Sequence, residues 1–270
     1  MFGKRLVSGI ILVILAVLVV GLGGIPLFIT SLIISLIGQF ELYRALGIDH
    51  KSIAAIGYMS SIVYYLLIWF EGRSYMAAMI TATLMVFMAA YVITFPEYKT
   101  EEITAGFFGV CYVSVMMSYL YLTRQLPDGK YLVWLIFLSS WGCDTAAYCA
   151  GMLLGRHKMV PALSPKKTWE GAIGGVLGAA LLGALFAYFF SDDMGIESPM
   201  FSCVFACGVG AVISQIGDLA ASAIKRNHNI KDYGRLIPGH GGILDRFDSM
   251  LFTAPAIYYA ISFAVNILHI

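Results

Sequence analysis

The chain has 270 residues, of which 60% are hydrophobic and only 12% are charged. Together with a mean hydropathy of +0.83, this composition excludes an ordinary soluble domain and predicts an integral membrane protein. Lys and Arg number 17 and Asp and Glu 16, so the net charge is uninformative and only the distribution of charge along the chain can indicate partners. No nucleic-acid partner is expected.

Nine apolar runs are close to the roughly 20 residues that a helix needs to cross a bilayer. Each run is continuous and is bounded by charged residues or by Pro and Gly. We therefore predict an all-α, polytopic membrane protein with about nine transmembrane helices, at approximately residues 6–23, 25–43, 52–70, 75–95, 103–123, 131–154, 170–190, 199–224 and 249–268.

The positions of the cationic residues predict how these helices are oriented, because cytoplasmic loops are enriched in Lys and Arg. If the N-terminus is cytoplasmic, 14 of the 17 Lys and Arg residues lie on the inner side, and only Arg73, Arg124 and Lys130 lie outside. Two loops, residues 155–169 and 225–248, then face the cytoplasm.

Polar residues concentrate in one segment, residues 222–249. It carries five cations, three carboxylates, two histidines and a glycine-rich turn, namely Lys225, Arg226, Lys231, Arg235, Arg246, Asp232, Asp245, Asp248, His228, His240 and residues 238–242. A loop that only connects two helices could be shorter and less polar. The segment is therefore the first candidate for a functional site.

Two further carboxylates lie inside apolar runs. Asp144 is near the middle of the sixth predicted span, and Asp218 lies in the eighth. Ionised carboxylates are costly in a membrane helix and normally face a cavity, a partner or an ion. Asp218, Ser222 and Lys225 are spaced to share one helical face. The alternative is that each aspartate only pairs with a neighbouring cation.

The first cytoplasmic loop of this half ends in a second group of cations. Lys166 and Lys167 directly precede Thr168, which we expect to cap the helix that follows. Basic residues at the cytoplasmic surface of the membrane can bind an anionic substrate. Alternatively, they only satisfy the positive-inside rule or contact lipid headgroups.

Two other features predict packing rather than chemistry. The seventh span is rich in Gly and Ala, and small residues allow neighbouring helices to approach closely. At the cytoplasmic end of the second span, Glu41 and Arg44 are three residues apart, a spacing that predicts an interfacial ion pair on one helix face.

The polar residues of this half suit chemistry at phosphorus. Hard oxygen ligands favour Mg²⁺, which takes one or two carboxylates and fills its other positions with water and substrate phosphate. Cations and a glycine-rich backbone can approach and neutralise phosphate oxygens. Because the site lies at a membrane, we expect one substrate to be a lipid phosphate ester. The candidate metal ligands are Asp144, Asp218, Asp245 and Asp248.

Three segments carry a resemblance to a known family. The run from Ser222 to Asp248 resembles the complete signature of the CDP-diacylglycerol synthases, also called phosphatidate cytidylyltransferases. The segment SPKKTWEG from Ser164 to Gly171, and WGCDTAAYxxG around Asp144, are also similar to family segments. The likeness covers roughly the C-terminal half, whereas the first five spans resemble the family only in being hydrophobic.

The resemblance implies a nucleotidyltransferase of phospholipid biosynthesis that condenses CTP with phosphatidic acid, giving CDP-diacylglycerol and pyrophosphate. It implies that Mg²⁺ is required, and a second cation fits such a cluster. Residues 1–125 are then a scaffold of about five helices and residues 126–270 a catalytic region of about four. We expect the enzyme in the cell inner membrane, with its active site facing the cytoplasm, and the resemblance is compatible with a homodimer.

The resemblance also assigns roles to individual residues. Asp218 and Asp245 are the leading metal ligands, with Asp144 and Asp248 as ligands or close neighbours. The catalytic set adds Lys225, Arg226, Arg246 and His240, although a structural role of His240 in the glycine turn is an alternative. The residues expected to bind substrate are Ser164, Lys166, Lys167, Ser222, Lys231, Gly239, Gly241 and Gly242.

Two other functions stay open on the sequence. A CTP-dependent lipid-alcohol kinase would transfer the γ-phosphoryl group and release CDP instead of pyrophosphate. A membrane transporter could also place aspartates within the bilayer, although the paired inverted repeats of many transporters are not evident. Turnover of CTP separates the enzymes from the transporter.

Overall fold

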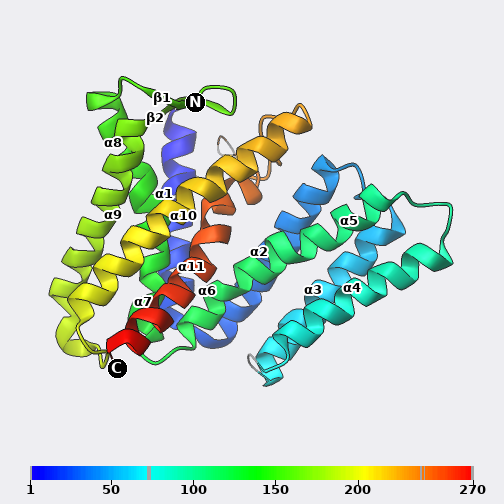
Figure 1. The fold of residues 1–270 in the computed structure, drawn as a ribbon, viewed down its shortest axis with the longest axis horizontal. Coiled ribbons are helices and arrows are strands. Elements are labelled where there is room, and N and C mark those ends of the chain that lie inside the picture. The colour runs from blue at the N-terminus through cyan, green and yellow to red at the C-terminus, as the bar shows by residue number, and fades with distance from the viewer. Residues whose placement is uncertain (1, 72–73, 238, 240, 269–270) are drawn as a thin grey trace. The chain divides into compact units, whose positions relative to one another are not determined.

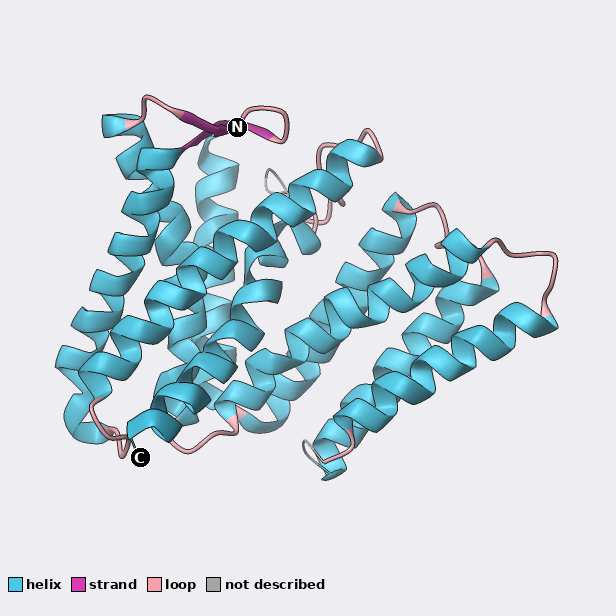
Figure 2. Ribbon diagram, in the orientation of Figure 1, coloured by secondary structure: helices cyan, strands magenta, loops and turns pink. Residues whose placement is uncertain are grey.

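The computed structural model describes residues 2–71, 74–237, 239 and 241–268 (Figure 1). Over these residues the chain is almost entirely helical, with one pair of short strands (Figure 2). Long apolar segments favour helices because a helix satisfies its own backbone hydrogen bonds. The prediction of an all-α, polytopic membrane protein is confirmed.

Within the described residues, seven helical segments are long and apolar enough to cross a membrane, and they match seven of the predicted spans. The predicted first and ninth spans overlap α1 (Phe2–Leu22) and α11 (Leu244–Leu268), which are not among these seven, so the predicted number of nine stays a prediction. Helix α11 begins at Leu244 rather than at residue 249, so three charged residues of the polar segment lie in its first turns. The seven segments are Gly24–Ala45, Ser52–Phe70, Met76–Ile93, Thr100–Arg124, Gly129–Leu154, Trp169–Asp193 and Pro199–Asn227.

The chain forms two compact units that alternate along the sequence. Unit 1 comprises Met1–Ala16, Gly24–Ser118 and His228–Arg246, and unit 2 comprises Val17–Gly23, Tyr119–Asn227 and Phe247–Ile270. The proposed division into residues 1–125 and 126–270 stays a prediction.

Unit 1 is a layer of helices around a buried aromatic and aliphatic core. Tyr43, Ile53 and Phe87 are fully buried in that core. Their large side chains fill the space between the helices, as close packing of a protein interior requires. Inside the unit, Gln39 accepts hydrogen bonds from Ser61 and donates to Tyr43. The elements are α2 (Gly24–Ala45), α3 (Ser52–Glu71), α4 (Met76–Ile93), α5 (Thr100–Gly109), the π-helical segment η1 (Val110–Val115) and the start of α6 (Met116–Arg124).

Unit 2 is built on three closely packed helices, α8 (Cys143–Leu154), α9 (Trp169–Phe190) and α10 (Pro199–Asn227), which lie side by side in Figure 1. Gly171, Gly175 and Gly183 are buried on α9, and a Cβ at Gly183 would lie 2.7 Å from the carbonyl oxygen of Cys203. The prediction of tight packing by small residues is therefore confirmed. The elements are α7 (Gly129–Phe137), the π-helical segment η2 (Leu138–Gly142), α8 (Cys143–Leu154), α9 (Trp169–Phe190), the 3₁₀ turn η3 (Ser191–Asp193) and α10 (Pro199–Asn227).

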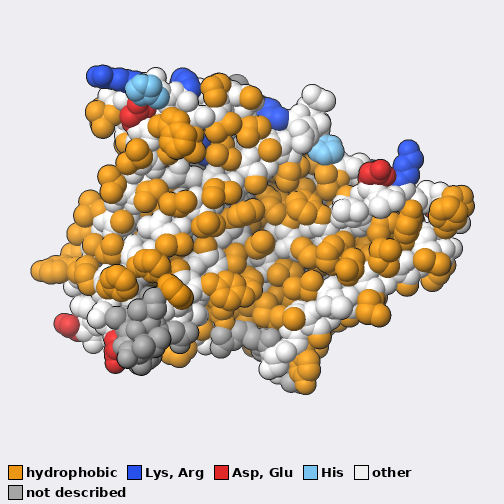
Figure 3. All heavy atoms as spheres, viewed as in Figure 1, with side chains coloured by type: hydrophobic (Ala, Val, Ile, Leu, Met, Phe, Trp, Pro, Cys, Tyr) orange, Lys and Arg blue, Asp and Glu red, His pale blue; other side chains and the backbone are white. Residues whose placement is uncertain are grey.

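The loop predicted at residues 155–169 contains a β-hairpin in the structure. Strand β1 (Lys158–Val160) pairs antiparallel with β2 (Ser164–Thr168), and Lys158 lies opposite Thr168. In unit 2, Figure 3 shows apolar side chains over the helices and Lys, Arg and His side chains gathered at the hairpin end. Exposed side chains such as Leu153 and Leu177, at 77% and 65%, agree with a lipid-facing surface.

Candidate active site

Two lysine–aspartate pairs connect the polar residues of unit 2. Lys167 of β2 forms an ion pair with Asp218 of α10, and Lys225 of α10 forms one with Asp248 of α11 at 3.5 Å. The second pair is the more buried, with side chains 12% and 11% exposed. Each aspartate is therefore paired with a cation from another element, and water screens the Lys225–Asp248 pair less than the Lys167–Asp218 pair.

A third carboxylate lies near these pairs. Asp144 is in the first turn of α8, directly after the π-helical segment η2. The charges of both Asp144 and Asp218 act on Asp248, so three of the four predicted metal-binding aspartates lie in one region of unit 2. Among the described residues, no three Asp, Glu, His or Cys side chains form a ready-made metal site. Mg²⁺ needs only one or two carboxylates beside water and phosphate, so these oxygen donors suit it in kind.

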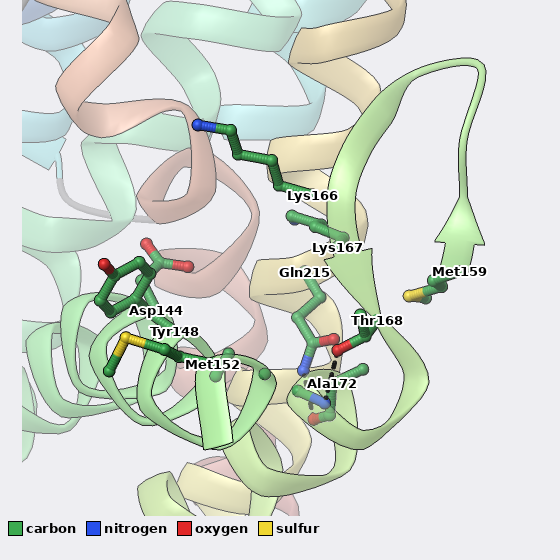
Figure 4. A pocket seen from close by; sticks show the side chains of 12 residues that line it. Asp144, Tyr148, Met152, Met159, Lys166, Lys167, Thr168, Ala172 and Gln215 are labelled. Atoms are coloured by element: carbon green, nitrogen blue, oxygen red, sulfur yellow. Dashed lines mark hydrogen bonds between the residues drawn. The ribbon is translucent and has the colours of Figure 1, made fainter. Parts of the chain in front are cut away.

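An open cavity of about 320 Å³ lies beside Asp144 and Lys167. Figure 4 shows Asp144 and Tyr148 on α8, Lys166 and Lys167 on β2, and Gln215 on α10 around it. The walls also include Met152, Met159 and Ala147, and most of the lining is apolar. The cavity therefore combines an apolar wall with two cations, which suits an amphiphilic anion.

Local hydrogen bonds hold the hairpin that carries the two lysines. The Thr168 hydroxyl accepts a hydrogen bond from the Gly171 backbone N–H at 3.1 Å, which confirms the predicted cap of α9. In the first turn of that helix, the Glu170 carboxylate accepts a hydrogen bond from the Arg156 backbone N–H at 3.1 Å and contacts His157 Nδ1 at 2.6 Å. Both ends of the hairpin are therefore fixed to the start of α9.

In unit 1, Asp245 organises the signature loop, residues 228–243. Its Oδ2 accepts backbone hydrogen bonds from Tyr233 at 2.8 Å, Gly242 at 3.0 Å and Gly234 at 3.4 Å. Asp245 is only 6% exposed, and the three N–H donors supply the hydrogen bonds that a buried carboxylate needs. Gly242 was predicted to bind substrate, but its backbone N–H already donates a hydrogen bond to Asp245.

The same loop surrounds a cationic cavity of about 620 Å³. Three cations, Lys231, Arg235 and Arg246, and one carboxylate, Asp232, line it together with Gly239 and Gly241. Both glycines have positive φ, 79° and 83°, a conformation that residues with a Cβ rarely adopt. Arg246 Nε is buried and has no hydrogen-bond partner among the described residues. A buried donor of this kind is costly unless an acceptor reaches it.

The other predicted residues are more dispersed. Ser164 begins β2, Ser222 is half-buried on α10, and Arg226 is exposed near the end of that helix. His240 lies outside the described residues. Tyr148, Gln215 and Arg235 line the two cavities and were not among the predicted site residues, although Arg235 was visible in the sequence as one of five cations in the polar segment.

Comparisons with known proteins extend over nearly the whole chain. Residues 3–264 match the model of the cytidylyltransferase family. A phosphatidate cytidylyltransferase of Staphylococcus haemolyticus is 30% identical over 258 residues, covering 94% of this chain and 96% of that protein. The one from Staphylococcus aureus is 31% identical over 261 residues, with the same coverage.

A third relative matches a shorter part of the chain at higher identity. The phosphatidate cytidylyltransferase of Rickettsia bellii is 37% identical over 154 residues, covering 56% of this chain and 66% of that protein. The match of the family model over most of the chain is thus supported by relatives aligned almost end to end. The chain belongs to the cytidylyltransferase family.

Proposed function

We propose that this enzyme is a phosphatidate cytidylyltransferase that makes CDP-diacylglycerol and pyrophosphate from CTP and phosphatidic acid. A phosphate oxygen of phosphatidic acid attacks the α-phosphorus of CTP, a new P–O–P bond forms, and the bond from the α-phosphorus to the bridging oxygen breaks to release pyrophosphate. The attacking phosphate is already anionic near neutral pH, so the reaction needs no general base. Positioning and neutralisation of charge then supply most of the catalysis.

The observation that carries this proposal is the buried Arg246 Nε at the cationic cavity of unit 1. A guanidinium donor without a protein acceptor suits an anionic ligand oxygen, and Lys231 and Arg235 line the same cavity. We assign this cavity to the phosphates of CTP. The exposed backbone of Gly239 lets a phosphate approach closely, as glycine-rich phosphate sites require.

We assign the cavity of unit 2 to phosphatidic acid. Its apolar wall suits the start of the acyl chains, and Lys166 and Lys167 suit the phosphomonoester. Lys167 is held by Asp218, so its ammonium group is oriented before the lipid arrives. Preorganised cations of this kind stabilise charge without reorganising during the reaction.

In unit 2, Mg²⁺ would be held by Asp218 and Asp248, with Asp144 close by. Asp245, at the start of α11 in unit 1, is the other predicted ligand. When bound, Mg²⁺ neutralises charge on the transferring and leaving phosphate oxygens. A second cation fits the remaining carboxylates. The grouping of Asp144, Asp218 and Asp248 supports this assignment, because a bound cation offsets the repulsion between neighbouring carboxylates.

We further propose that the enzyme works as a homodimer in the cell inner membrane, with its active site facing the cytoplasm. The bias of Lys and Arg towards one side supports this orientation. In vesicles of known orientation, CTP added outside should be consumed only when the cytoplasmic face is outward. Light scattering of the detergent-solubilised protein measures the oligomeric state.

The first test measures pyrophosphate release by purified protein with CTP, phosphatidic acid and Mg²⁺. We expect release that depends on all three, and none with a lipid alcohol in place of phosphatidic acid. Formation of CDP without pyrophosphate would instead identify a lipid-alcohol kinase. Binding of lipid without any turnover of CTP would favour a transporter.

Matched variants connect this activity to the site. Asp218→Asn and Asp248→Asn should each reduce pyrophosphate release by about 100-fold or more, because each removes a candidate metal ligand and releases a lysine from its ion pair. Asp192→Asn makes the same chemical change in the exposed turn η3 of unit 2 and should leave the rate unchanged. Equal rates in all three variants would contradict the proposed site.

A further inference from the structure

Glu41 is a buried carboxylate far from the signature loop in sequence but bonded to it in space. It lies near the end of α2 and is only 3% exposed. Its Oε1 accepts a hydrogen bond from the Ile243 backbone N–H at 3.1 Å, and its Oε2 accepts one from Leu244 at 2.8 Å. Buried charges are stable only when such partners are present.

The two donors stand at the N-terminus of α11, which begins at Leu244. The first N–H groups of a helix have no partner within the helix, and the positive end of its dipole favours a negative charge there. Glu41 therefore caps α11 from another helix. The capped first turns carry Asp245, Arg246 and Asp248.

Arg44 bonds the same loop at a second place, Tyr233. It lies three residues after Glu41, and its Nη2 donates to the Tyr233 carbonyl oxygen at 2.6 Å. The Tyr233 N–H donates in turn to Asp245. The sequence predicted only an ion pair between Glu41 and Arg44, whereas in the structure both side chains bond the signature loop.

Two glycines of the loop, Gly234 and Gly242, lie directly against the Glu41 carboxylate. A Cβ built on Gly242 would overlap three atoms, all of them in the Glu41 carboxylate group, and a Cβ on Gly234 would overlap it as well. Gly242 has no positive φ, so its backbone conformation alone does not exclude a side chain. The space taken by Glu41 is what makes glycine necessary at this position.

From these contacts we infer that Glu41 and Arg44, the α2 clamp, are positioning residues that hold the signature loop and the start of α11 in their active geometry. This inference rests on the proposed function, because the loop is the part that we assign to CTP. Neither residue lines the cationic cavity. The clamp acts through the backbone, which in turn places Asp245 and Arg246.

The closing experiment is a double-mutant cycle on Glu41 and Gly242. Gly242→Ala should reduce kcat/KM for CTP by about 10- to 100-fold, because misplacing reacting groups by about 1 Å can cost that much. Glu41→Ala should cause a similar loss. The double variant should be no worse than Glu41→Ala alone, because removing the carboxylate frees the space that the alanine methyl needs.

Two further measurements separate positioning from simple loss of fold. Glu41→Gln keeps the size of the side chain but loses one acceptor and the charge, and we expect it to reduce kcat and raise KM for CTP while KM for phosphatidic acid stays within about twofold. Glu101→Gln, at an exposed position of α5, is the matched control. Equal losses for both substrates, or additive effects in the cycle, would overturn the inference.

Hydrogen exchange of the loop tests the clamp without using activity. The amides of Ile243 and Leu244 should exchange at least about tenfold faster in Glu41→Gln than in the parent protein, since their acceptor is weakened. If the parent protein showed no cytidylyltransfer while this difference remained, the proposed function would fail and the clamp would stand. Unchanged exchange in a folded variant would reject the clamp itself.

Discussion

The candidate site residues of unit 1 and unit 2 are held in different ways. In unit 1 the signature loop is fixed mainly through backbone groups, which donate to the buried carboxylates of Glu41 and Asp245. In unit 2 the polar groups are side chains on helices and a hairpin, joined by the pairs Lys167–Asp218 and Lys225–Asp248.

This difference suggests how each region tolerates change. A loop that relies on backbone hydrogen bonds has one arrangement, and loss of its central acceptor leaves several buried donors unsatisfied at once. Side-chain ion pairs can exchange partners with an incoming ligand or metal ion, so the loss of one cation leaves fewer groups without a partner. We therefore expect substitution of a carboxylate that holds the loop of unit 1 to be more damaging than substitution of a lysine that lines the cavity of unit 2.

Among the substitutions that compare how the two units are held, Asp245→Asn should have the largest effect. The substitution keeps the size of the side chain but replaces one oxygen by an amide nitrogen, so the three N–H groups that meet at Oδ2 lose a charged acceptor. We expect pyrophosphate release to fall by about 100-fold or more, with a higher KM for CTP. Steady-state kinetics in detergent measures both values.

The control for this substitution is Glu97→Gln, also in unit 1. Glu97 lies between α4 and α5, is exposed and does not line the cationic cavity. Substitutions at such surface positions usually change little, so the rate should stay close to that of the parent protein. A loss of less than threefold in Asp245→Asn would show that the loop does not depend on its central carboxylate.

Most of the helices could be predicted from the sequence, because each continuous apolar run must form a helix in a bilayer. The cap at Thr168 and the small-residue packing of α9 were also predictable, since both depend on local sequence patterns. The start of α11 was not. Hydropathy placed it at residue 249, but the helix extends through charged residues whose cost is offset by contacts made elsewhere in the fold.

The contacts of the site depend on distant partners and were less predictable. Asp218 and Lys225 were expected to share a helical face, yet each pairs with a residue more than 20 positions away. Glu41 is separated from Leu244 by 203 positions, and its local spacing to Arg44 suggested only an ion pair. Sequence patterns identify which residues are polar, whereas the fold decides which of them meet.

A smaller and more selective effect is expected for Lys167→Ala in unit 2. Loss of one charged hydrogen bond to a phosphate should raise KM for phosphatidic acid by about 10- to 100-fold, since such bonds contribute about 1.5–3 kcal/mol. KM for CTP should change much less. Varying each substrate at saturating levels of the other separates the two constants.

Lys158→Ala is the matched control for the lipid cavity. Lys158 is exposed on the partner strand β1 and does not line the cavity. The same rise in KM for both lysine variants would point to a general attraction of anionic lipid to the hairpin. A rise for CTP alone in Lys167→Ala would contradict the assignment of this cavity to phosphatidic acid.

The smallest effect should follow from Thr168→Ala, which removes the cap between the hairpin and α9. The Gly171 N–H would lose its acceptor, and a lost cap typically lowers the free energy of unfolding by about 1 kcal/mol. Because Thr168 follows Lys167 directly, KM for phosphatidic acid should also rise, by about fivefold or less. Thr168→Ser keeps the hydroxyl group and should restore both thermal stability and KM, whereas a variant as impaired as Thr168→Ala would mean that the methyl group, packed close to Gly155, matters more than the cap.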